Sequence, residues 1–164
     1  MFRKLFQTYD DSALAFLRLV LGLVFFAHGA QKVLGWFGGP GYAGAMNMFT
    51  NGLGFPPVLG AIAIWTEFAG GLLLIIGFIA RIDALAIGIE MVVAIVKVHA
   101  ANGFFMNWAG TQHGEGFEYH LLVIAMAVLL VARGAGAFSV DHALMCTGRT
   151  HPTHPHPYPA PSGD

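Results

Sequence analysis

The sequence predicts an all-α integral membrane protein, a four-helix bundle whose two termini both face the cytoplasm. Composition gives the first reason, because 56% of the 164 residues are hydrophobic and only 10% are charged, against about 25% charged residues in ordinary soluble domains. The second reason is a series of long apolar segments, and the third is a one-sided distribution of lysine and arginine around them. Lipid is therefore expected to surround much of the protein.

Each apolar segment is predicted to cross the hydrocarbon core as a helix, which takes roughly 20 residues. The segments cover residues 12–34, 57–79, 82–101 and 117–131. Only Arg81 and its neighbours separate the second segment from the third, so these two are predicted to form a tight antiparallel hairpin. The connections 35–56 and 102–116 are longer and rich in Gly, Phe, Trp and Asn.

Basic residues determine the predicted orientation. Arg81 lies in the short middle turn, and the other basic residues in question flank the first and last segments: Arg3, Lys4, Arg133 and Arg149. Neither long connection contains Lys or Arg. Because cytoplasmic loops carry an excess of these residues, the face with the basic residues is predicted to be cytoplasmic and the long connections to lie outside.

The chain is predicted to contain one membrane domain, residues 1–141, and a disordered Pro/His-rich tail, residues 142–164. Proline at nearly alternate positions excludes helix and sheet in the tail. The tail histidines His151, His154 and His156 allow a less favoured alternative, in which they bind a divalent ion; no metal site is predicted elsewhere. The net charge of −1 gives no support for a nucleic-acid partner. The one cysteine excludes an intramolecular disulfide.

Polar side chains gather where the first segment approaches the outer face. His28, Gln31 and Lys32 have the spacing i, i+3 and i+4, which places them on one helical face. Each also has a simpler interpretation, since a histidine can bond to a backbone carbonyl and a lysine can extend to the membrane interface. Their shared face nevertheless favours a common environment.

Glu67 and Glu90 lie near the middle of the second and third segments. A charged residue at that depth costs roughly 2.5–3.5 kcal/mol on the insertion scale, whereas a leucine returns only about 0.3–0.6 kcal/mol. Such residues are tolerated when they face the bundle interior and find partners. We predict an ion pair of Lys97 with Glu90. Lys32 is predicted to pair with Glu67 or Glu118.

Further ionisable side chains lie near the outer ends of the third and fourth segments: Lys97, His99, Glu118 and His120. Together with the deep carboxylates they predict a polar pocket in the outer half of the bundle. Small residues allow the close helix packing that would keep lipid out of this pocket, and the relevant glycines are Gly22, Gly29, Gly70 and Gly71. The glycine-rich stretch 35–44 is predicted to cover its outer mouth.

Three stretches together carry a resemblance to a known family. They are LRLVLGLVFFAHGAQKVLGWFGG, GLGFPPVLGAIAIWTEFAGGLLLIIGFIARIDALAIGIEMVVAI and GFEYHLLVIAMAVLLVARGAGAFSVD. They contain the patterns R-x-x-x-G-x-x-x-x-x-H-G-x-x-K, E-x-x-G-G and G-x-G-x-x-S-x-D. The chain resembles the DoxX family of small four-helix bacterial membrane proteins over about residues 14–141. The resemblance implies a multi-pass protein of the bacterial cytoplasmic (inner) membrane.

The family takes its name from the small subunits of a thiosulfate:quinone oxidoreductase, so the resemblance also implies a membrane subunit of a redox assembly, which we expect to be quinone-linked. A quinone needs an apolar slot, hydrogen-bond donors for its carbonyl oxygens and a route for protons. The groups predicted to be catalytic are His28 and Lys32 as donors and Glu67 or Glu118 as proton relay. The residues predicted to bind the cofactor are His28, Gln31, Lys32, Glu67, Glu90, Lys97, His99 and His120.

The chain has no cysteine cluster, no C-x-x-C-H haem motif and no G-x-G-x-x-G nucleotide loop. Electrons are therefore expected to come from a partner subunit or an outside donor, and whether the chain itself catalyses a reaction stays open at this point. An alternative is a non-catalytic membrane anchor or assembly subunit, with a partner subunit or as a homo-oligomer. Less favoured alternatives are small-molecule transport and a haem b held by His28, His99 and His120.

Overall fold

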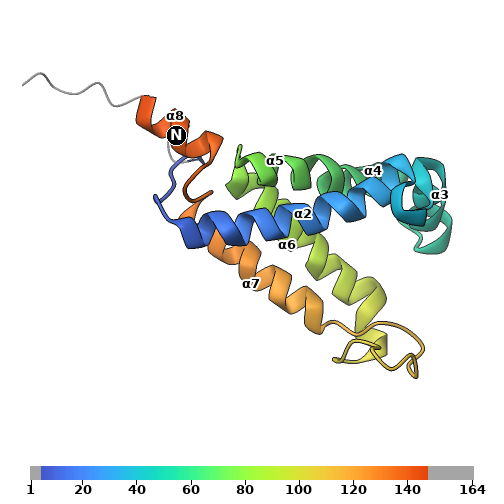
Figure 1. Ribbon diagram of the computed structural model, residues 1–164. Helices are drawn as coiled ribbons and strands as arrows, with labels where there is room; N and C mark the ends of the chain where they lie inside the picture. The colour runs from blue at the N-terminus through green and yellow to red at the C-terminus, as the bar shows by residue number, and fades with distance from the viewer. Residues whose placement is uncertain (1–4, 148–164) are drawn as a thin grey trace, which may run out of the picture.

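The computed structural model describes residues 5–147, and every secondary-structure element in that part of the chain is helical (Figure 1). The predicted all-α fold is therefore confirmed. Three stretches of these residues are long and apolar enough to cross a membrane: Ser12–Leu34, Pro57–Ile76 and Ala80–Asn102. The first is the single helix α2 (Ser12–Leu34), which starts at Asp11, whose carboxylate accepts the Ala13 backbone N–H at 2.8 Å.

The second and third stretches are each built from several helical pieces. The second consists of α4 (Pro57–Trp65), the π-helical turn η3 (Thr66–Gly70) and α5 (Gly71–Ile76). The third consists of α6 (Ala80–Ala94), the π-helical turn η4 (Ile95–His99) and the 3₁₀ turn η5 (Ala100–Asn102). π-helical turns are rare and occur frequently at functional sites. Here they contain Glu67 and His99.

The fourth predicted segment, 117–131, forms helix α7 (Glu118–Arg133), which has 16 residues. At 1.5 Å per residue α7 is roughly 24 Å long, which is shorter than a hydrocarbon core of about 30 Å. The helix ends at Gly134, whose φ of 89° favours glycine. Figure 1 shows α7 running back along α6 toward the start of α2.

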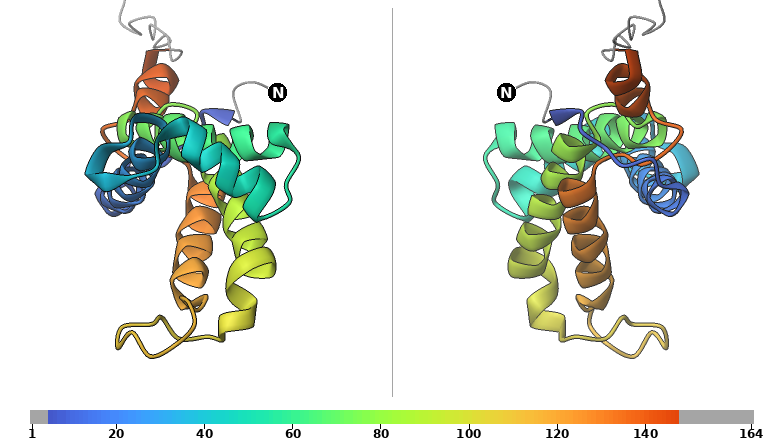
Figure 2. Two further views of the ribbon diagram at one scale, coloured as in Figure 1. Left: turned by 90° about the vertical axis from the view of Figure 1, so that its right-hand side faces the viewer. Right: turned by 90° about the vertical axis from the view of Figure 1, so that its left-hand side faces the viewer.

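The four helical stretches pack as two pairs. Helix α2 lies along η3 and α5, and α6 lies along α7. Figures 1 and 2 show that the pairs meet near the beginning of α2 and diverge toward the other end. The two long connections, at the ends of α2 and α6, are therefore separated from each other.

The first long connection is mostly helical rather than irregular. It contains η1 (Trp36–Gly38), α3 (Gly41–Asn47) and the π-helical turn η2 (Met48–Gly52). A Cβ atom at Gly39 would lie 2.6 Å from the Cα atom of Gln31, so the chain folds back tightly onto the end of α2. The connection packs against α2 and α4. That residues 35–44 cover the outer mouth of a polar pocket stays a prediction.

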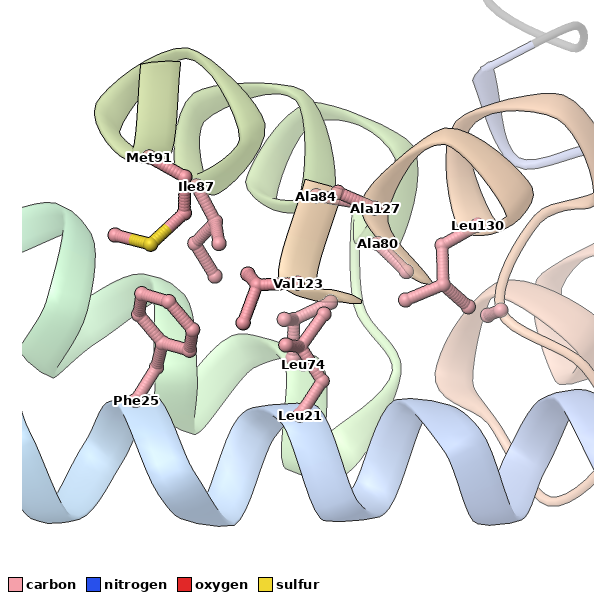
Figure 3. Close-up of a cluster of buried hydrophobic side chains, with 11 residues drawn as sticks. Leu21, Phe25, Leu74, Ala80, Ala84, Ile87, Met91, Val123, Ala127 and Leu130 are labelled. Carbon is pink, nitrogen blue, oxygen red and sulfur yellow. The ribbon is translucent and has the colours of Figure 1, made fainter. Parts of the chain in front are cut away.

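Buried apolar side chains join the two pairs where they meet (Figure 3). Leu21 of α2, Leu74 of α5 and Ile87 of α6 belong to this cluster, and the last two are fully buried. Leu130 of α7 completes the layer and is also fully buried. This apolar layer holds the helices together at one end and leaves the other end free to diverge.

The end at which the pairs meet carries Arg81 and Arg133, and we call it the basic end. Arg81 donates hydrogen bonds to the carbonyl oxygen of Gln7 at 2.8 and 3.0 Å. The Arg133 guanidinium lies 5.0 Å from the centre of the Tyr9 ring. These two residues lie on one face, as the positive-inside prediction requires. The other three predicted residues, Arg3, Lys4 and Arg149, lie outside the described part of the chain.

Arg18 ties three chain segments together at the basic end. Its side chain is 1% exposed and donates only to backbone carbonyl oxygens: Leu74, Ile75 at 2.6 Å, Ala135 at 2.8 Å and Phe138 at 3.2 Å. Gly77 lies directly against it, since a Cβ atom there would be 2.9 Å from the guanidinium carbon. The guanidinium therefore fixes the end of α5 and the segment after α7 relative to α2.

Asp141 fixes the start of α6, as Arg18 fixes the end of α5. Its carboxylate accepts the backbone N–H of Ile79 at 2.8 Å and of Ala80 at 3.0 Å, so it caps α6 from a distant part of the chain. Burial raises the pKa of Asp141 above its usual value, and these two donors oppose that shift. Asp141 belongs to α8 (Val140–Thr147). The predicted boundary at residue 141 thus falls inside a helix, and the rest of the predicted tail, 148–164, lies outside the described residues.

Candidate functional site

Charged side chains from three helical stretches meet inside the protein, and we call them the buried charge cluster: Lys32 of α2, Glu67 of η3 and Glu90 of α6. Lys32 Nζ and Glu67 Oε2 form an ion pair, with side chains that are 16% and 10% exposed. Of the two partners that the sequence predicted for Lys32, Glu67 and Glu118, the ion pair forms with Glu67. Pairing of this kind makes buried charge tolerable in a membrane protein.

Glu90 adds a second carboxyl group to this ion pair. Its carboxyl lies close enough to the Glu67 carboxyl and to Lys32 to interact electrostatically with both. An ionised carboxylate only accepts hydrogen bonds, so a bond between the two groups requires one proton on the pair. The Oε2 atom of Glu90 is buried and has no hydrogen-bond partner among residues 5–147. The cluster therefore brings together a lysine, two carboxyl groups and one buried oxygen without a hydrogen-bond partner in the described chain.

Close glycine packing sets the register of this cluster. A Cβ atom at Gly29 would overlap the backbone of Phe68 and lie 2.7 Å from the carbonyl carbon of Glu67. A Cβ atom at Gly71 would lie 2.9 Å from the Cα atom of Phe26. Gly29 precedes Lys32 by three residues and so shares its helical face. The close approach of α2 to η3 that the sequence predicted is therefore what brings Lys32 to Glu67.

Titratable rings extend from the cluster toward the outer end, by which we mean the end opposite the basic end. Tyr119 lies within the electrostatic reach of Glu67. Its ring centre is 5.8 Å from that of His120, which in turn is 4.1 Å from that of His99. His120 is 6% exposed, and its Nδ1 atom is buried without a partner in the described part of the chain. His99 donates from Nδ1 to the carbonyl oxygen of Glu115 at 2.8 Å.

Other predicted residues lie outside the cluster. His28 is exposed, because the face of Gly29 and Lys32 turns toward η3 and leaves His28 beside it. Gln31 is half-buried beneath Gly39. Lys97 is exposed, and the predicted Lys97–Glu90 ion pair is absent from the described residues. A π-helical turn holds more residues than an α-helical turn, so η4 rotates Lys97 away from the face that carries Glu90.

Glu118 and Glu115 bind the second long connection. Glu118 Oε1 accepts the Met106 backbone N–H at 3.0 Å, and Glu115 Oε2 accepts the Asn107 backbone N–H at 2.6 Å. Glu118 is thus engaged at the start of α7 rather than paired with Lys32. The functional roles predicted for Glu118, His28, Gln31 and Lys97 stay predictions.

A metal ion or a haem fits the described residues poorly. No group of three or more His, Cys, Asp or Glu side chains within residues 5–147 is arranged to hold a metal ion. The rings of His99 and His120 are in contact, which leaves no space for a porphyrin between them. His28, the third histidine expected near a haem, is exposed.

A quinone head group fits the donor set better. Lys32 has three N–H donors and uses one for Glu67. The buried, unsatisfied atoms Glu90 Oε2 and His120 Nδ1 are further polar groups to which a carbonyl-bearing ring can bind. Phe25 and Met91, which follows Glu90 in the chain, are both buried members of the apolar cluster. The chemistry of the cluster therefore suits a flat apolar molecule with oxygen acceptors.

A groove of about 480 Å³ lies elsewhere, on α6 and α7, and it is apolar throughout. Its α6 residues include Leu85, Ile89 and Val92. Helical periodicity places Glu90 on the opposite side of α6 from these residues. The groove therefore does not belong to the buried charge cluster.

Tyr119 is the residue near the cluster that the sequence did not single out for a function. It follows Glu118 and precedes His120 at the start of α7, where an interfacial tyrosine is common in membrane proteins. The feature of the sequence that could have indicated Tyr119 is that it directly precedes His120, a histidine expected to face the interior. Its nearness to Glu67 depends on how α7 packs against α6 and α2, which no local pattern encodes.

An all-helical fold with spanning helices and a buried charge cluster defines an integral membrane protein with a polar interior. The family model described as DoxX matches residues 13–100. The chain belongs to the DoxX family, and the resemblance seen in its sequence motifs is confirmed. No solved structure matches this chain.

Relatives extend the match beyond residue 100. The inner membrane protein YqjF of Escherichia coli (strain K12) is 28% identical over 136 residues, covering 82% of this chain and 94% of that protein. An uncharacterized protein of Haemophilus influenzae is 32% identical over 139 residues, covering 83% and 93%. A Bacillus subtilis protein named putative oxidoreductase CatD is 26% identical over 114 residues, covering 70% and 75%.

Proposed function

We propose that the chain is a membrane subunit of a redox assembly and that its buried charge cluster binds the head group of a quinone. The observation that carries this proposal is the meeting of Lys32, Glu67 and Glu90 inside an otherwise apolar domain. A structural ion pair needs one carboxylate, and burying a second carboxyl costs additional free energy. A cation beside a proton-holding carboxyl pair suits a ligand that has oxygen acceptors and takes up protons.

In this proposal Lys32 binds the quinone and the Glu67–Glu90 pair supplies a proton. Reduction of a bound quinone to a quinol consumes two electrons and two protons. Lys32 donates a hydrogen bond to one carbonyl oxygen and so orients the ring. The Glu67–Glu90 pair holds a proton within the apolar interior, where it can be delivered to that oxygen and then replaced. The second proton goes to the other carbonyl oxygen and is supplied by water.

The electrons come from a partner subunit that carries a redox group, because this sequence contains no motif for such a group. The printed name of the Bacillus subtilis relative, putative oxidoreductase, supports a redox role. The name of the Escherichia coli relative supports a bacterial inner-membrane location. In that membrane we place the basic end in the cytoplasm.

A non-catalytic anchor is the second candidate function. Large aromatic side chains on the outer connections favour it, since Phe37, Phe105 and Trp108 are 74%, 67% and 88% exposed. Exposed aromatic residues are enriched where proteins bind each other. In this alternative the connections dock a partner, and the buried charge cluster only holds the helices together.

Binding of ubiquinone-1 to the purified full chain in lipid nanodiscs distinguishes the two candidates. Quenching of tryptophan fluorescence reports binding, because Trp65 lies two residues before Glu67. We expect the wild-type chain to bind, and Lys32→Met and Glu67→Gln to weaken binding by roughly tenfold or more, as loss of a charged hydrogen-bond donor or acceptor does.

Lys97→Met is the matched control, because it removes an exposed lysine near the end of another spanning stretch, and this proposal does not use the cofactor-binding role that the sequence predicts for Lys97. Its affinity should equal that of the wild type. Absence of binding by the wild type, together with a stoichiometric partner in mild-detergent preparations, would favour the anchor. Equal binding by all variants would remove the quinone site from the buried charge cluster.

A further inference from the structure

His120 is a buried histidine to which the proposed binding of a quinone by Lys32, Glu67 and Glu90 assigns no proton-transfer role. It lies in the first turn of α7, is 6% exposed and has an unpartnered Nδ1 atom within the described chain. A buried polar atom without a partner costs about 1–3 kcal/mol, so a purely structural role would favour an apolar residue here. The neighbours of His120 suggest what its ring nitrogens do.

His120 lies between the buried charge cluster and a more exposed histidine. On one side its ring contacts that of His99, with centres 4.1 Å apart. On the other side it meets the Tyr119 ring at 5.8 Å, and Tyr119 is within the electrostatic reach of Glu67. These side chains come from η4, α7 and η3, so the row crosses from one helix pair to the other.

Between the buried charge cluster and the basic end, apolar side chains take the place of the titratable rings. Asp83 is the next titratable residue of α6 in that direction, seven residues before Glu90, or roughly 10 Å along the helix axis. The buried side chains of Leu74 and Ile87 belong to the apolar layer at this level of the protein (Figure 3). Apolar packing at protein density leaves no room for a chain of water molecules.

We propose that His99, His120 and Tyr119 form the proton route between the outer face and the buried charge cluster. This inference deepens the proposed function, on which it rests for the use made of the protons, by assigning them to the outer side of the membrane. The titratable and charged groups facing the route are Lys32, Glu67, Glu90, Glu115 and Glu118. The route does not use Asp83, whose Oδ1 atom would lie 3.7 Å from a Cβ atom at Gly70, one helical turn from Glu67 on the side toward the basic end.

Each step of the route moves one proton and no electrons. His99 donates its Nδ1 proton to the carbonyl oxygen of Glu115, so its Nε2 atom is the site that accepts a proton from solution. The proton passes to His120, which releases another from its second ring nitrogen toward the Tyr119 hydroxyl. Tyr119 accepts that proton and gives its own to the Glu67–Glu90 pair. The charges of the relay groups are then unchanged, and His120 is left as its other neutral tautomer, which rotation of the ring resets before the next transfer.

Hydrogen–deuterium exchange of the carboxyl pair tests the route without any quinone. The full chain in lipid nanodiscs is transferred to D₂O, and infrared spectroscopy follows the C=O band of the protonated carboxyl, which Glu90→Gln identifies by removing it. We expect His120→Ala and Tyr119→Phe to slow the exchange by at least roughly tenfold, as loss of a relay group does. Added imidazole should restore the rate in His120→Ala, which a merely structural role of His120 would not allow.

Asp83→Asn is the matched control at the basic end, and its exchange rate should equal that of the wild type. Wild-type rates in both His120→Ala and Tyr119→Phe would overturn the route. Slow exchange in Asp83→Asn would overturn it as well, because protons would then enter from the basic end. Intact, His120-dependent exchange in a chain that binds no ubiquinone-1 would contradict the proposed function alone and leave the route standing.

Discussion

Arg18 shows at the residue scale how one buried charge is satisfied without an acidic partner at hydrogen-bond distance. Its guanidinium has five N–H donors in a planar fork, and four backbone carbonyl oxygens from two other segments surround it. A lysine offers a compact ammonium with three donors and no fork. The arrangement therefore requires arginine, and the requirement can be measured.

Arg18→Lys is expected to lower the free energy of unfolding by about 2–4 kcal/mol, since hydrogen bonds to a charged group contribute about 1.5–3 kcal/mol each and lysine cannot form all of them. Circular dichroism during titration of mixed micelles with SDS measures this change. Arg133→Lys is the matched control, because Arg133 is exposed and contacts only the Tyr9 ring in the described residues. It should cost no more than about 1 kcal/mol. Equal losses in both variants would contradict the role assigned to Arg18.

At the scale of elements, neighbouring glycines of the second stretch have different environments. A Cβ atom at Gly71 would overlap the Phe26 backbone of α2, whereas the nearest atom to a Cβ at Gly70 is Asp83 Oδ1 at 3.7 Å, an ordinary contact. Gly71 is needed for the packing of α2 against the second stretch, and Gly70 is not. Their adjacency in the sequence makes them a matched pair.

Gly71→Ala is expected to push α2 away from α5 and destabilise the fold by about 1–3 kcal/mol, as overpacking does. It should also weaken ubiquinone-1 binding, because the displacement separates Lys32 from Glu67. Gly70→Ala should be neutral or stabilising by up to about 1 kcal/mol, since alanine favours helix over glycine. SDS titration and the fluorescence assay measure both effects. A larger loss in Gly70→Ala would contradict the packing described here.

The sequence predicted most of the elements and part of the site. Apolar runs located all four helical stretches, and spacing placed Lys32 on an interior face together with deep Glu67. The absent Lys97–Glu90 ion pair and the exposed position of His28 have local physical causes: a π-helical turn rotates Lys97 outward, and the Gly29 contact determines which edge of α2 is buried. Neither cause has a periodic signature, because both depend on contacts between helices.

At the scale of the whole molecule, the protein is two helix pairs held at the basic end and divergent at the other. Arg18, Asp141 and the apolar layer fasten the basic end. The buried charge cluster is the polar link between the pairs farther out, since Lys32 and Glu67 belong to one pair and Glu90 to the other. The angle between the pairs was not predictable from the sequence, because hydropathy reports helix length and depth but not crossing geometry.

The central claim is that charges from separate helices meet inside the membrane domain, and a double-mutant cycle on Lys32 and Glu67 tests it most directly. Unfolding free energies of the wild type, Lys32→Met, Glu67→Gln and the double variant give the coupling between the two side chains. The structure predicts a coupling of about 1–3 kcal/mol for this pair and additive effects for the control pair Lys97 and Glu67. Additive effects for Lys32 and Glu67, within about 0.5 kcal/mol, would contradict the account.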